Sequence, residues 1–136
     1  MKISGILETC IYASDLEAMR RFYSLLPGLS CIGHKENEHV FFKCGEAYLL
    51  IFNPKSTENE NGEVNGDPIP CHGAYGPSHV AFAIHSDDVK TWRAWLMEHS
   101  ILIESEVTWP SGGRSLYFRD PAGNSIEVAE PRIWQS

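Results

Sequence analysis

The sequence lacks the features of several large classes of protein. Its four cysteines include no Cys-x-x-Cys pair, which argues against a zinc knuckle or a disulfide scaffold and favours reduced thiols. No apolar run approaches the roughly 20 residues that a membrane helix needs. The first residues show no apolar signal-peptide segment. We therefore expect a cytoplasmic protein with no membrane partner.

Motifs for phosphate binding and for a serine nucleophile are also missing. Neither a P-loop nor a dinucleotide fingerprint occurs, and no nucleophile elbow is present. The net charge of -7 opposes a phosphate backbone, so nucleic acid is not an expected partner. With 136 residues, 43% of them hydrophobic, the chain is long enough to bury a core as one domain.

One order of elements is present twice along the chain. In the first half, alternation over 6–12 predicts a strand, Ser14-Asp15 offers a helix cap, and short strands are expected at 29–33, 39–43 and 47–52. The second half repeats this with a strand at 79–85, a cap at Ser86-Asp87, and strands at 102–106, 114–119 and 125–129. Both predicted helices space their apolar residues alike: Leu16, Met19, Phe22 and Tyr23, then Val89, Trp92, Trp95 and Leu96.

This repeat predicts an α+β fold of two βαβββ modules within a single domain, 1–136. The first module spans 1–54 and the second 76–136, with a connector at 55–75. The polar stretch from residue 53 to 72 predicts a flexible segment without a core, which is mobile or covers a ligand site. Two sheets of this kind can pair into an eight-stranded, cup-shaped mixed sheet, and a small molecule would bind in the cup.

Three segments carry a family resemblance. The hairpin at 115–128, SLYFRDPAGNSIEV, contains a strong turn signal at 120–124. The others are the strand GPSHVAF at 76–82 and the opening strand and helix at 6–23. Together they resemble the vicinal-oxygen-chelate superfamily of glyoxalases, fosfomycin-resistance proteins, bleomycin-resistance proteins and extradiol dioxygenases. The resemblance spans nearly the whole chain and implies the glyoxalase/bleomycin resistance/dioxygenase fold.

The resemblance also implies a divalent metal ion in the cup, held from four equivalent strand positions. These positions are Glu8, Leu50, His79 and Glu127, and leucine cannot bind a metal. Strand alternation independently places the other three on cup-facing sides. One imidazole and two carboxylates suit Zn²⁺, Mn²⁺, Ni²⁺ or Fe²⁺. Three protein ligands leave the open position that a catalytic metal needs.

Further residues are candidates for binding or catalysis. Glu8 or Glu127 can double as the base. Arg114 is a candidate clamp for a substrate carboxylate or phosphate, although a surface ion pair is an equal alternative. His72 is a candidate acid or base, with a plain loop histidine as the commoner reading. Tyr12 is a candidate pocket wall or phenolic donor, against ordinary packing.

Three functions remain open on the sequence. The leading hypothesis is a metal-dependent enzyme of the glyoxalase type, acting on a small oxygen-bearing substrate by isomerase, lyase or thiol-transferase chemistry. An extradiol-type dioxygenase is an alternative, but that chemistry usually uses two histidines, and Glu8 stands where one is expected. A metal-free, drug-binding protein of the bleomycin-resistance type is the third. The resemblance further implies a homodimer, in which Glu8 and His79 can come from different subunits.

Overall fold

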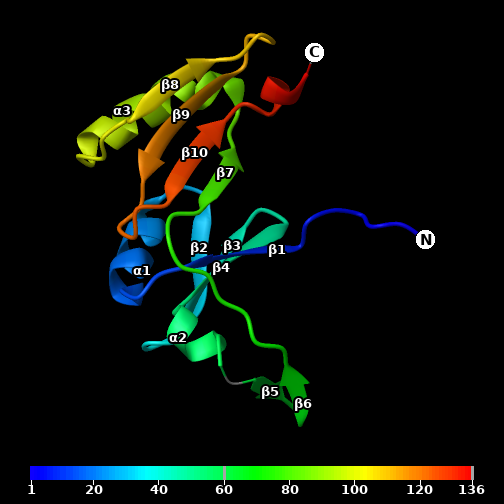
Figure 1. Ribbon diagram of the computed structural model, residues 1–136. Helices are drawn as coiled ribbons and strands as arrows, with labels where there is room; N and C mark the ends of the chain where they lie inside the picture. The colour runs from blue at the N-terminus through cyan, green and yellow to red at the C-terminus, as the bar shows by residue number, and fades with distance from the viewer. Residues whose placement is uncertain (60, 136) are drawn as a thin grey trace. The chain divides into compact units, whose positions relative to one another are not determined.

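The chain folds into two compact units, Met1–Gly76 and Pro77–Ser136, in a computed structural model that describes residues 1–59 and 61–135 (Figure 1). Each unit contains one four-stranded mixed sheet and one long helix. The predicted fold class, α+β with two βαβββ modules, is confirmed. Over the described residues, no helix has the length and apolar character needed to span a membrane.

The first unit is built around the sheet β1-β4-β3-β2, in which β1 runs parallel to β4 and the other pairs are antiparallel. Its helix α1 begins after Asp15, whose side chain accepts a hydrogen bond from the Ala18 N–H at 3.0 Å, so the predicted cap is confirmed. One face of the sheet packs on α1 and forms the core. The elements are β1 (Glu8–Tyr12), α1 (Leu16–Leu25), β2 (Leu29–Lys35), β3 (His39–Cys44) and β4 (Ala47–Phe52).

The connector has more structure than its composition predicts. It contains a short helix α2 (Pro54–Thr57) and a hairpin of β5 (Gly62–Val64) and β6 (Asp67–Ile69). Asn65 and Gly66 both have positive φ, 53° and 85°, as a two-residue hairpin turn requires. This Asn-Gly signal outweighs the polar composition around it. All residues of β5 and β6 are exposed, so the hairpin adds no buried core.

The second unit repeats the plan in the sheet β7-β10-β9-β8, with α3 on one side of it (Figure 1). The helix-facing core contains Val89 and Leu96 of α3 and apolar residues of β9 and β10, among them Leu116, Phe118, Ile126 and Val128. The elements are β7 (His79–Ala83), the 3-10 helix η1 (Ser86–Asp88), α3 (Val89–Glu98), β8 (Ser105–Thr108), β9 (Arg114–Arg119), β10 (Ser125–Ala129) and the 3-10 helix η2 (Pro131–Trp134).

Two local predictions in this unit are wrong. The strand expected at 102–106 is shifted, because β8 pairs with β9 from Ser105 opposite Tyr117 to Thr108 opposite Arg114. Pairing across the hairpin therefore sets the strand, and the apolar run at 101–103 does not. The Ser86-Asp87 cap is also absent: these residues form η1, and α3 begins after Asp88 without a side-chain cap.

Candidate metal centre

The four candidate positions occupy equivalent places in the two sheets. In the first unit Glu8 pairs with Tyr48 and Cys10 with Leu50. In the second unit His79 pairs with Ser125 and Ala81 with Glu127. Each unit thus carries its two candidate positions on adjacent parallel strands, two residues out of register. The repeat predicted from the sequence is confirmed in the pairing of the strands.

The second unit brings His79 and Glu127 together. His79 Nε2 lies 3.3 Å from Glu127 Oε1. The Glu127 side chain is 6% exposed and that of His79 50%, so the buried carboxylate meets a half-open imidazole. Tyr117 of β9 stacks on the His79 ring at a centroid distance of 6.2 Å. Among the described residues no cluster of three or more His, Cys, Asp or Glu side chains forms.

The imidazole of His79 is oriented by its other nitrogen. Nδ1 lies 2.9 Å from the carbonyl oxygen of Ser125, which can only accept a hydrogen bond. Nδ1 therefore carries a proton, and in the neutral ring Nε2 presents its lone pair toward Glu127. An N–H to carbonyl bond of this kind fixes the tautomer of metal-binding histidines.

Glu127 is held by polar neighbours on its own face of the sheet. The Ser115 hydroxyl donates to Glu127 Oε2 at 2.5 Å, and Ser115 is fully buried. Burial, followed by the Glu127 charge and a hydrogen bond to Glu127, raises the pKa of Tyr117. Tyr117 therefore remains a neutral phenol at pH 7. Strand alternation on β9 could have identified both residues, because Ser115 and Tyr117 share the Glu127 face.

In the first unit, Glu8 lies on the face of β1 that points away from α1. Glu8 and Cys10 are exposed, whereas Ile11 on the opposite face is buried. The pKa of the Cys10 thiol is raised by burial and then by the charge of Glu8. Leu50 pairs with Cys10 on the neighbouring strand. This face therefore offers one carboxylate, and Leu50 adds an apolar wall beside it.

Two of the predicted binding residues meet at the end of the same face. The Tyr12 hydroxyl lies 2.6 Å from His72 Nδ1. Burial raises the pKa of Tyr12, with a smaller effect of Cys10, so the phenol keeps its proton and donates it to His72. The Phe52 ring lies 4.7 Å from the His72 ring. The end of the connector is thus attached to the first sheet by a specific polar pair.

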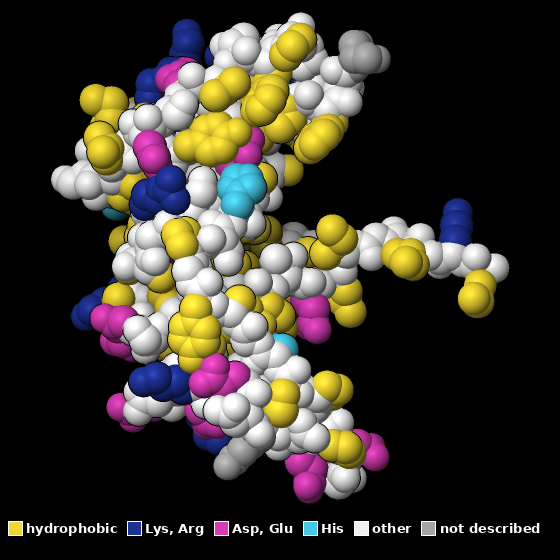
Figure 2. Space-filling view, in the orientation of Figure 1, with side chains coloured by type: hydrophobic (Ala, Val, Ile, Leu, Met, Phe, Trp, Pro, Cys, Tyr) yellow, Lys and Arg dark blue, Asp and Glu magenta, His cyan; other side chains and the backbone are white. Residues whose placement is uncertain are grey.

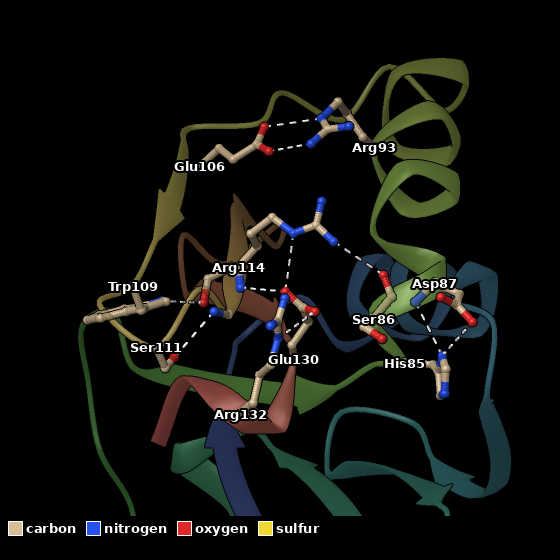
Figure 3. Close-up of polar contacts among 12 residues, drawn as sticks. His85, Ser86, Asp87, Arg93, Glu106, Trp109, Ser111, Arg114, Glu130 and Arg132 are labelled. Carbon is tan, nitrogen blue, oxygen red and sulfur yellow. Dashed lines mark hydrogen bonds and ion pairs between the residues drawn. The ribbon is translucent and has the colours of Figure 1, made fainter. Parts of the chain in front are cut away.

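Arg114 lies away from the Glu127 face. Alternation places its side chain with the core residues Leu116 and Phe118, on the helix side of β9. Its Nε donates to Glu130 at 3.2 Å and its Nη2 to the Ser86 carbonyl at 3.3 Å (Figure 3). Arg114 therefore forms an ion pair with Glu130, and a role as a substrate clamp stays a prediction.

The comparisons with known proteins agree with this architecture. Residues 5–128 match the sequence profile of the Glyoxalase/Bleomycin resistance protein/Dioxygenase superfamily. The chain belongs to this superfamily. The resemblance inferred from the sequence is confirmed.

Individual superfamily members resemble the chain over nearly its full length. The crystal structure of lactoylglutathione lyase from Agrobacterium tumefaciens shares 39% identity and a TM-score of 0.90, with 100% of both chains covered. Metallothiol transferase FosB from Staphylococcus epidermidis (strain ATCC 12228 / FDA PCI 1200) is 25% identical over 130 residues, 94% of this chain and 82% of the relative. The fosfomycin resistance protein FosX from Mesorhizobium loti, 19% identical with a TM-score of 0.64, shares the fold over 95% of this chain and 93% of its own.

Proposed function

We propose that the protein is a divalent-metal-dependent enzyme of the glyoxalase type that acts on a small oxygen-bearing substrate. The observation that carries this proposal is the approach of His79 Nε2 to Glu127 Oε1 at 3.3 Å. Both atoms carry lone pairs when the ring is neutral, so the contact needs a proton or a cation between them. Two ligands about 2.1 Å from one ion lie about 3.0–3.4 Å apart, which agrees with this spacing.

A comparison of Glu127 with a second buried carboxylate, Glu130, supports a metal cation, and not a proton, between Glu127 and His79. Glu130 is 1% exposed and is paired with the guanidinium groups of Arg114 and Arg132. Glu127 is 4% exposed, and within the described residues no arginine or lysine pairs with it. A buried carboxylate is costly without a positive partner. A divalent ion between Glu127 and His79 supplies that partner.

Within this proposal Glu8, His79 and Glu127 hold the ion, which is Zn²⁺, Ni²⁺, Mn²⁺ or Fe²⁺. When bound, such an ion polarises a carbonyl and stabilises negative charge on oxygen. Glu8 or Glu127 would also serve as the base that takes a proton from the substrate. The neutral phenol of Tyr117 lies beside His79 and hydrogen-bonds to Glu127, so it can help to orient that carboxylate. Tyr12 and His72, which are hydrogen-bonded to each other, are further candidates for binding the substrate.

The relatives narrow the reaction classes to be tested. One is named a lactoylglutathione lyase and another a metallothiol transferase. One name contains a thioester of glutathione and the other a thiol, so we propose lyase or thiol-transferase chemistry ahead of ring cleavage. Oxygen uptake on a catechol would favour the dioxygenase alternative instead.

A metal titration of chelator-treated protein tests the proposal. Calorimetry with Zn²⁺ and Mn²⁺ should show one strong site per chain in the wild type. His79→Ala removes a ligand atom and should weaken binding by at least about 100-fold, because loss of a hydrogen-bond partner of a ligand alone costs about 10–100-fold. His99→Ala, an exposed histidine stacked on Trp95, is the matched control and should bind like the wild type. Equal binding by His79→Ala, or no binding by the wild type, contradicts the proposal.

A further inference from the structure

We infer that Ser115 and Trp109 are positioning residues that present one selected oxygen of Glu127 to the ion. The inference rests on the proposed function, because it concerns the same carboxylate. Three side chains form a continuous chain of hydrogen bonds within the second unit. The Trp109 indole lies 2.9 Å from Ser115 Oγ, and Ser115 Oγ lies 2.5 Å from Glu127 Oε2.

The direction of this chain is fixed by what each group can donate. An indole N–H only donates, so Ser115 Oγ must accept from Trp109. The serine proton then points at Glu127 Oε2, which accepts it. A charged acceptor makes this the stronger of the two bonds. Oε2 is therefore engaged, and Oε1 is the oxygen that faces His79 Nε2 at 3.3 Å.

The loop between β8 and β9 holds Trp109 in place. Trp109 N–H donates to the Gly113 carbonyl at 2.8 Å, and Gly112 N–H donates to the Trp109 carbonyl at 2.8 Å. Gly112 has φ +87°, which favours glycine, and a Cβ on Gly113 would lie 2.8 Å from Ile133. Gly112 and Gly113 therefore form a closed turn packed against η2.

This arrangement has a chemical consequence for the ion. With Oε2 engaged by the serine, Glu127 would offer Oε1 alone to a bound ion. The remaining positions stay available for substrate or water, as a catalytic site requires. Without the serine hydroxyl, Oε2 would lose its hydrogen bond to Ser115. The carboxylate could then turn so that Oε2 also faces the ion. Partners of this kind typically change metal affinity by 10–100-fold.

The test measures Zn²⁺ affinity and the visible spectrum of the Co²⁺-loaded protein, which reports coordination number. Ser115→Ala should weaken Zn²⁺ binding about 10–100-fold and change the intensity of the Co²⁺ bands. Ser125→Ala is the matched control, since this half-buried serine lies on the same face and keeps the carbonyl that binds His79. Its affinity should stay within about twofold of the wild type.

A double-mutant cycle separates positioning from general stability. Trp109→Phe keeps the ring but removes the N–H, and should weaken binding less than Ser115→Ala. Because Trp109 acts through Ser115, adding Trp109→Phe to Ser115→Ala should change the affinity no further. Circular dichroism confirms that each variant is folded at the temperature of titration.

Each result decides the inference. Additive losses, or a Ser115→Ala protein with wild-type affinity and spectrum, overturn the positioning role and leave the proposed metal site standing. A wild-type protein that binds no ion overturns both. Loss of affinity in Ser115→Ala with an unchanged Co²⁺ spectrum overturns the claim that Ser115 sets the coordination of Glu127.

Discussion

Glu130 shows how single residues stabilise a charge inside the second unit. Its Oε2 accepts from the Arg114 backbone N–H at 2.6 Å and from Arg114 Nε at 3.2 Å, while Oε1 accepts from Arg132 Nε at 3.2 Å (Figure 3). Burial by itself raises the pKa of Glu130, but these hydrogen bonds and the charge of Arg132 outweigh it, and the net pKa is lowered. Glu130 is therefore ionised and stabilising at neutral pH.

The lowered pKa predicts a pH-dependent stability. A carboxylate with a folded pKa below its unfolded value of about 4.3 stabilises the fold above that value. The contribution is lost as the pH falls through the folded pKa. Glu130→Gln should cost about 2–3 kcal/mol of unfolding free energy at pH 7, and this difference should shrink below about pH 4.

Urea unfolding at pH 7, 5 and 3.5 measures the effect of Glu130. The exposed Glu36→Gln variant is the control and should unfold like the wild type throughout. If the Glu130→Gln difference is as large at pH 3.5 as at pH 7, the charge of Glu130 is not its source.

At the scale of elements, the turn between β9 and β10 links the hairpin to β7. Asp120 Oδ1 accepts from the Ala122 and Asn124 N–H groups at 2.9 and 3.0 Å. Asn124 Nδ2 donates to Asp120 Oδ2 at 2.8 Å, and Asn124 Oδ1 accepts from the Ser78 N–H at 2.7 Å. Ser78 precedes His79, so one buried amide holds the start of the histidine strand beside β10.

We therefore expect Asn124→Ala to affect both stability and metal binding. Loss of buried hydrogen bonds should cost about 2–3 kcal/mol of unfolding free energy, and Zn²⁺ affinity should fall because β7 is less firmly placed. Denaturant unfolding and calorimetry measure the two effects. Pro121→Ala, an exposed change in the same turn, should alter neither. Wild-type values for Asn124→Ala would show that β7 is placed by its strand pairing alone.

The sequence predicts most elements here because alternation and helical spacing are local signals. The strands at 47–52, 114–119 and 125–129 agree with β4, β9 and β10 at both ends. The shift of β8 depends on its pairing with β9, and a single strand does not contain that information. The contact of Trp109 with Ser115 depends on the β8–β9 turn, so it could not be predicted from residue types alone.

At the scale of the whole molecule, a homodimer remains a prediction, and one structural observation supports it. Residues 1–7 precede β1 as an extended segment with exposed apolar side chains (Figure 1, Figure 2). Exposed apolar groups of this kind often mark contacts between proteins. They are Met1, Ile3, Ile6 and Leu7. Light scattering at micromolar concentration should give the mass of a dimer, and a monomer would count against it.

Mixing two variants that do not bind Zn²⁺ strongly shows whether each metal site uses one chain or two. We expect Glu8→Ala and His79→Ala each to lose strong Zn²⁺ binding. If Glu8 and His79 of one site come from different subunits, a mixed dimer contains one intact site and one doubly altered site. Half of the wild-type stoichiometry per mixed dimer then returns. If every site is built within one chain, mixing restores nothing. Dimers reassembled from a single variant are the control.

The shared register of the two sheets allows the candidate ligands of the two modules to be compared position by position. Glu8 corresponds to His79, and Leu50 corresponds to Glu127, at matching places in the two strand pairs. Two identical copies of a module would present the same pair of side chains twice. The two modules differ at both positions. The second module has an imidazole and a carboxylate there, whereas the first has a carboxylate and an apolar side chain. A carboxylate in place of Leu50 would therefore give the first module two candidate ligands at the same places as in the second.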